Sequence, residues 1–257
     1  MTVLSASACG FLSIFFGYHA MSFGLVWLHY TTDAARGKVQ PSKAAAAASV
    51  VEWCPLWRLL TGGHRSTSRA RHPRQDLYAS VNILVSSLFA AVVGGCISAG
   101  RTRVVCDGNP LASAGGVARS FALSVLWQSV AEYYWHRVMH LPRVYRAMHK
   151  IHHFHKSPAP FDDLCIHPAE AFGYYVILYS TVLVVPQHLT AFLLYMALMG
   201  ACGVLDHSGV ALAVPGYAVV HHDKHHELFE CNFGFPFVFM DLLHGTFARP
   251  ELRASAR

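Results

Sequence analysis

The sequence predicts an all-α membrane protein, a polytopic helical bundle of about four or five spans with a histidine-rich cap at one face of the bilayer. Hydrophobic residues make up 54% of the chain and charged residues 13%, whereas about 25% of a typical soluble domain is charged. Uncharged stretches of membrane-spanning length recur along the chain, and histidines gather in short boxes between them. This combination excludes an ordinary soluble domain.

Two spans are predicted in the first part of the chain. Residues 9–30 and 77–100 contain no Asp, Glu, Lys or Arg, and each stretch is long enough to cross a bilayer. Neither a basic region before residues 9–30 nor a small-residue cleavage site after them is present, which favours a retained span over a signal peptide. Residues 31–76 are polar and basic and predict a loop, and residues 101–116 predict a turn.

The second part predicts one further span and a hairpin of two. Residues 117–135 are charged only at Arg119 and Glu132, near the ends of the stretch. The 35 residues from 171 to 205 carry no formal charge, but a single helix of this length would measure about 50 Å, against a hydrocarbon core of about 30 Å. Pro186 and the two residues after it supply a turn, so we expect two short spans.

The distribution of basic residues predicts the orientation in the membrane. If residues 31–76 face the cytoplasm, the order of spans places 136–170 and 206–257 on the same side. These three segments hold 17 of the 20 Lys and Arg residues, and the other side keeps Arg101, Arg103 and Arg119. The positive-inside rule favours this arrangement. All three histidine boxes are therefore expected on the cytoplasmic face.

The histidine boxes are the candidate functional site. They are His136-x3-His140, His149-x2-His152-His153 and His222-x2-His225-His226. Residues three and four apart share a helix face, so each box is predicted to present its histidines as one patch. Imidazole is the commonest protein metal ligand, and eight imidazoles exceed the six that one ion accepts, so we predict a di-metal site. Spacing leaves zinc, copper, iron and nickel open.

Other histidines receive different interpretations. His207 lies just past the predicted hairpin and joins the ligand set as a ninth candidate. His221 competes with His222, but the repeated spacing favours His222. A supporting role is open for His155 and for His167, which could orient a ligand or cap the next helix. The histidines at 19, 29, 64, 72, 188 and 244 are interpreted as structural.

Composition and spacing argue against several other functions. The net charge is +6. The basic residues flank the spans and form no nucleic-acid motif, so no nucleic-acid partner is expected. Seven scattered cysteines predict neither a disulfide framework nor a cysteine zinc site. A metal transporter would need ionisable residues inside the spans, and a haem cytochrome would need isolated histidines deep within them. The chain offers little of either.

The boxes and their placement resemble the fatty acid hydroxylase superfamily over residues 120–247. Asp206-His207-Ser208-Gly209, Cys231-Asn232-Phe233, Asp241 and Gly245-Thr246 resemble the sterol branch, which includes cholesterol 25-hydroxylase, C-4 methylsterol oxidase and sterol C-5 desaturase. Together with the composition, this resemblance predicts three parts: membrane spans with a basic loop over 1–116, a catalytic domain over 117–247, and a polar tail over 248–257.

The resemblance implies a di-iron, O2-dependent enzyme of the endoplasmic reticulum that hydroxylates a lipid C–H bond, with a sterol as the expected substrate. Desaturation is the alternative outcome, because it differs from hydroxylation by small changes in substrate placement. No catalytic side chain is implied beyond the nine ligands. The chain carries neither a dinucleotide fingerprint nor a haem-binding His-Pro-Gly-Gly motif, so electrons are expected from cytochrome b5 or an NAD(P)H-dependent reductase.

Overall fold

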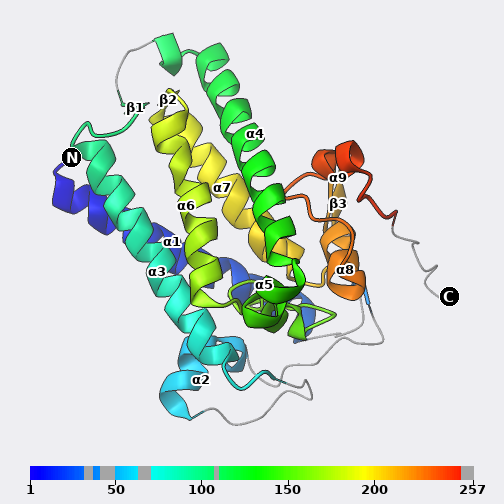
Figure 1. Cartoon of the computed structure of the whole chain (residues 1–257). Helices are drawn as coiled ribbons and strands as arrows, with labels where there is room; N and C mark the ends of the chain where they lie inside the picture. The colour runs from blue at the N-terminus through cyan, green and yellow to red at the C-terminus, as the bar shows by residue number, and fades with distance from the viewer. Residues whose placement is uncertain (32–36, 41–49, 63–70, 107–109, 250–257) are drawn as a thin grey trace.

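The computed structural model describes residues 1–31, 37–40, 50–62, 71–106 and 110–249, and within them it is a helical bundle (Figure 1). The long helices are α1 (Val3–Tyr30), α3 (Gln75–Ser98), α4 (Ala114–Met139), α6 (Pro168–Val184) and α7 (Leu189–Asp206). They correspond to the five predicted spans. The expected hairpin turn is confirmed, because α6 ends at Val184 and α7 begins at Leu189.

Three of these helices, α1, α3 and α7, are long and apolar enough to cross a membrane by length and composition. The helix α6 has 17 residues, and α4 carries the charges of Arg119 and Glu132 within its length. Together the helices confirm an all-α membrane bundle, with sheet restricted to two short pairs in the described part of the chain.

The helices α1 and α3 pack closely because small residues face one another. A Cβ atom added at Gly10 would lie 2.3 Å from the backbone oxygen of Ala90, and one added at Gly94 would lie 2.6 Å from that of Ala6. Small residues four apart on each helix let the two backbones approach, which is a common way of packing helices in membranes.

The helices α4, α6 and α7 enclose the main core. Tyr175, Tyr179, Tyr195 and Met199 are buried there, and Phe89 of α3 packs against this cluster. Tyr175 donates a hydrogen bond of 2.9 Å to the backbone oxygen of Asn82, which ties α6 to α3. The buried hydroxyl group of Tyr175 thus finds a partner inside the bundle.

Short elements close the two ends of the bundle. At one end β1 (Val104–Val105) pairs in parallel with β2 (Gln187–His188), so the loop after α3 meets the α6–α7 turn. The other end holds α5 (Pro142–Ala147), the 3-10 helix η4 (His149–Phe154), the hairpin of β3 (Ala213–Val214) and β4 (Tyr217–Ala218), and α8 (Val219–Leu228) (Figure 1). All three histidine boxes lie at this second end.

The remaining elements pack around the bundle. The helix α2 (Pro55–Thr61) packs on α3, and the 3-10 helix η2 (Val51–Trp53) contacts α1 and α2. The 3-10 helix η3 (Pro110–Ala112) contacts α4 and β2, and α9 (Phe239–His244) packs on α4. Of the predicted polar tail, residues 250–257 lie outside the described residues, as do parts of the predicted basic loop at 32–36, 41–49 and 63–70.

Candidate metal centre

The nine candidate ligands come together at the end of the bundle. Among the described residues they form two groups, and within each group the ligand atoms lie within 4.8 Å of one another. Group 1 contains His136, His140, His149, His153 and His225, and group 2 contains His152, His207, His222 and His226. Eight of the nine side chains are buried, and that of His140 is half-buried.

The first box presents His136 and His140 to one group, as the spacing predicted, but the second and third boxes do not act as single patches. The second box sends His149 and His153 to group 1 and His152 to group 2, and the third box is divided between His225 and the pair His222 and His226. Neighbouring residues point about 120° apart on the 3-10 helix η4 and about 100° apart on α8. Adjacent histidines therefore face different groups. Group 1 takes residues from all three boxes, and group 2 takes residues from the second and third boxes together with His207.

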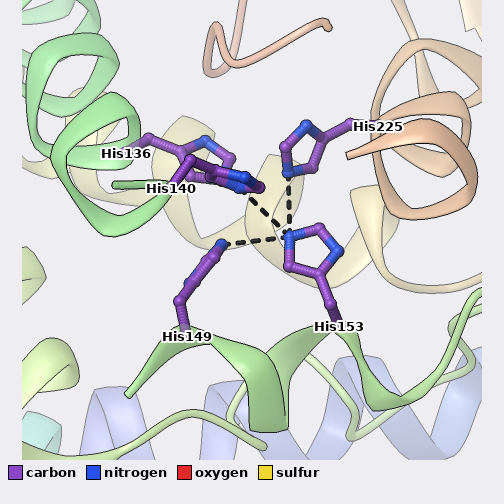
Figure 2. Close-up of side chains that lie close together, drawn as sticks. All are labelled: His136, His140, His149, His153 and His225. Carbon is purple, nitrogen blue, oxygen red and sulfur yellow. Dashed lines mark hydrogen bonds between the residues drawn. The ribbon is translucent and has the colours of Figure 1, made fainter. Parts of the chain in front are cut away.

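The imidazole nitrogens converge at close range. In group 1, Nε2 of His153 lies 3.0 Å from Nε2 of His149, 3.1 Å from that of His225 and 3.2 Å from that of His140 (Figure 2). In group 2, Nε2 of His207 lies 2.9 Å from Nε2 of His222 and 3.1 Å from that of His152. Nitrogens gathered on a common point are what a metal ion requires.

The tautomers of several histidines are set by backbone carbonyl groups. Nδ1 of His136 donates to the Phe233 oxygen at 3.0 Å, and Nδ1 of His225 donates to the Cys231 oxygen at 2.7 Å. Nδ1 of His207 and Nδ1 of His226 likewise donate to backbone oxygens, at 2.9 and 3.1 Å. A carbonyl oxygen only accepts, so Nδ1 must carry the hydrogen and Nε2 keeps its lone pair for a metal.

Two observations show that these residues fit metal ions. The buried Nε2 atoms of His136 and His226 have no hydrogen-bond partner among the described residues, although buried polar atoms are normally satisfied. Burial, followed by the repulsion of neighbouring histidines, lowers the pKa of His149, His152, His153 and His222. Neutral imidazole is the ligand form, so both groups suit metal binding.

Glu170 orients His149 and was not assigned a role from the sequence. Its Oε1 accepts a hydrogen bond of 2.5 Å from Nδ1 of His149, and both side chains are fully buried. A carboxylate behind a histidine ligand fixes the ring and raises its basicity. The one available signal was a lone carboxylate directly before a long uncharged stretch.

A loop after α8 explains the Cys231-Asn232-Phe233 motif. The carboxylate of Asp241 accepts hydrogen bonds from the backbone N–H groups of Phe233 and Gly234 at 2.8 and 2.7 Å, and from the Thr246 hydroxyl at 2.7 Å. These bonds hold the loop whose Cys231 and Phe233 carbonyls orient two ligands. The motif supports the site through its backbone.

The other histidines near the boxes lie outside both groups. The ring of His155 contacts Gln75 at 3.0 Å, while its backbone oxygen orients His226. His167 caps α6, because its Nδ1 accepts from the Ala169 N–H at 3.2 Å. His221 packs against Phe247, with ring centroids 5.4 Å apart.

An apolar cavity of about 550 Å³ opens onto both groups. Its walls come from α1, α3, α4, α6 and α7, and they include His136 of group 1 and His152, His207 and His222 of group 2. Ligand cavities commonly measure about 300–1,000 Å³ and are mostly apolar. The cavity can therefore bring an apolar molecule directly to the histidines.

Comparison with known proteins gives a family match for just under half of the chain. Residues 121–246 match the fatty acid hydroxylase model. The chain is 34% identical over 120 residues to the Delta(7)-sterol 5(6)-desaturase of Saccharomyces cerevisiae, which covers 45% of this chain and 32% of the relative. It is 32% identical over 125 residues to the lathosterol oxidase of Mus musculus, covering 46% of this chain and 42% of the relative.

The chain thus spans less than half the length of these two relatives. No solved structure matches the chain. The matched segment begins within α4 and ends just after α9, so it contains all nine candidate ligands. Residues 121–246 therefore resemble a fatty acid hydroxylase domain, and the chain is similar to a sterol desaturase and a lathosterol oxidase.

Proposed function

We propose that this protein is a membrane-bound, O2-dependent oxidoreductase that uses two iron ions to oxidise a lipid C–H bond, with a sterol as substrate. The observation that carries the proposal is the pair of all-imidazole groups at the end of an apolar cavity. A cavity with apolar walls suits a lipid better than a path for metal ions, which would need polar or ionisable walls.

Group 1 would hold one iron ion and group 2 the other. Bound iron would supply the activation of O2 that an unreactive C–H bond demands. The protein's own contribution is to hold nine neutral imidazoles in place through the Glu170 carboxylate and the loop carbonyls, and to position the substrate in a cavity that excludes water. No other side chain is assigned a catalytic role.

Hydroxylation and desaturation would use the same site. The similar proteins are a Delta(7)-sterol 5(6)-desaturase and a lathosterol oxidase, which supports a sterol substrate here. Which product forms depends on how the substrate carbon lies relative to the metals. Cytochrome b5 or an NAD(P)H-dependent reductase would supply electrons at the cytoplasmic face of the endoplasmic reticulum.

The test combines metal analysis with lipid profiling. Purified protein is expected to bind close to two iron ions, and cells that express it should accumulate an oxidised or newly unsaturated sterol. His153→Ala should reduce the bound iron and abolish the product, because Nε2 of His153 contacts three other ligands. His167→Ala is the matched control, since His167 lies outside both groups. Full activity in His153→Ala would refute the assignment.

A further inference from the structure

Two polar side chains interrupt the apolar wall of the cavity on α4. Glu132 and Gln128 both line it, and they lie one helical turn apart on the same face of the helix. Ionisable side chains at membrane depth are costly, and they usually mark a functional site. Neither residue contacts a histidine of groups 1 and 2 in a described hydrogen bond, so the metal centre does not account for them.

The pair is held in one orientation. Tyr195, fully buried on α7, donates a hydrogen bond of 2.9 Å to Oε1 of Gln128. The Tyr195 hydroxyl also lies 2.9 Å from the backbone oxygen of Leu178, and the Nε2 donor of Gln128 bonds to Oε2 of Glu132. The second carboxyl oxygen of Glu132, Oε1, makes no hydrogen bond to the described residues. An oriented acceptor is therefore available on the cavity wall.

Glu132 lies one helical turn before the histidine end of α4, and the part of α7 that faces the pair is apolar. Glu132 precedes the ligand His136 by four residues, a rise of about 6 Å along α4. On α7 the cavity extends from Leu193 to His207, a length of about 21 Å. Leu178 of α6 and Met196 of α7 also line the cavity, beside Tyr195, whose hydroxyl lies 2.9 Å from both Gln128 and the Leu178 backbone oxygen. A long molecule with one polar end matches this distribution.

We propose that Glu132, positioned by Gln128, binds the hydroxyl group of a lipid alcohol. The alcohol donates its hydrogen to Oε1 of Glu132, and its hydrocarbon body extends toward Leu193 and Met196. No Lys or Arg is among the described residues of the cavity wall, so a fatty acid would place a second carboxyl group beside Glu132 with no basic side chain of the wall to pair with it. The site thus selects alcohols over fatty acids.

This orientation determines which carbon meets the metal groups. With the hydroxyl beside Glu132, the atoms nearest His136 belong to the hydroxyl-bearing end of the molecule. Oxidation falls on a carbon a few bonds from the hydroxyl rather than at the far end of the hydrocarbon body. This part of the inference rests on the proposed function, whereas hydroxyl binding does not.

Equilibrium binding to the full-length protein in detergent tests the first part without turnover. The probes are cholesterol, cholesterol methyl ether, which lacks the O–H donor, and oleate, each measured by displacement of a fluorescent sterol. The wild-type protein is expected to bind cholesterol roughly tenfold or more tightly than the ether, the effect of one buried hydrogen bond. Glu132→Leu should remove this preference, and Glu132→Gln should retain part of it because its amide oxygen still accepts.

Controls keep the result interpretable. Glu52→Leu makes the same chemical change in η2, away from the cavity, and should leave the preference intact. If Glu132→Leu does not fold, Gln128→Leu replaces it and should weaken the preference, because the carboxyl loses its positioning bond. Equal binding of alcohol and ether by the wild type, or an unchanged preference in Glu132→Leu, would overturn the inference.

The two proposals fail separately. Binding that requires the hydroxyl, without oxidation of any lipid, would leave this inference standing and refute the proposed function. Oxidation of a sterol whose binding does not depend on Glu132 would do the reverse. A product oxidised at the end of the hydrocarbon body remote from the hydroxyl would contradict the orientation.

Discussion

At the scale of single residues, the site depends on which nitrogen of each imidazole carries the hydrogen. Four of the nine candidate ligands donate Nδ1–H to a backbone oxygen, and His149 donates to Glu170. Each such bond turns Nε2 toward the centre of its group. The protein thereby selects the ligand form of its histidines before any metal binds, which reduces the reorganisation that binding requires.

The bond between His149 and Glu170 leads to a graded prediction. Glu170→Ala removes the acceptor for Nδ1–H and should weaken iron binding about 10–100-fold. Glu170→Gln keeps an amide oxygen that can accept the same hydrogen, so a smaller loss is expected. Iron titration of the purified protein measures both, with Glu52→Gln as the control. Equal iron affinity in the wild type and Glu170→Ala would show that the bond has no effect on the metal.

At the scale of helices, the contact between α1 and α3 depends on the absence of side chains. Gly10 and Gly94 each lie where a Cβ atom would meet the backbone of the other helix. Both helices also line the cavity, so a change in their separation would alter its width.

Gly94→Ala should therefore destabilise the bundle. The added methyl group would overlap the Ala6 backbone oxygen, and such overpacking typically costs about 1–3 kcal/mol. Gly24→Ala is the matched control, since a Cβ atom at Gly24 meets nothing within 4 Å. Thermal unfolding in detergent compares the two variants. A melting temperature for Gly94→Ala at or above that of Gly24→Ala would contradict the close approach.

Hydropathy predicted the helices well because a span depends mainly on its own composition. The predicted stretches 77–100 and 117–135 appear as Gln75–Ser98 and Ala114–Met139. The histidine boxes predicted where ligands gather, but not their division, since that depends on the angle between adjacent side chains. The role of Glu170 and the presence of the cavity could not be predicted, because each depends on contacts between segments that are distant in sequence.

At the scale of the whole molecule, the histidine groups and the β1–β2 pair occupy opposite ends of the bundle (Figure 1). The basic residues predict that the histidine end faces the cytoplasm and the β1–β2 end faces the other side. Cys106, exposed in the loop after β1, provides a native marker for that second end.

Labelling of Cys106 tests the orientation. In a variant that keeps this cysteine alone, a membrane-impermeant maleimide should react only when the non-cytoplasmic side of the vesicles is accessible. The complementary marker is Lys150→Cys in the same background, at an exposed position in η4, and it should react from the cytoplasmic side. The opposite pattern would invert the topology and place the metal groups on the other face.

The wall of the cavity combines residues inside the segment that matches the family model with residues outside it. The histidines come from residues 121–246, whereas Ile14, Tyr18 and Met21 of α1 and Ile83 of α3 lie outside that match and still form the wall. Changes in the first hundred residues can therefore reshape what fits beside the metals while every ligand stays the same. Related proteins with this arrangement can therefore differ in the substrate they bind while the histidine groups stay the same.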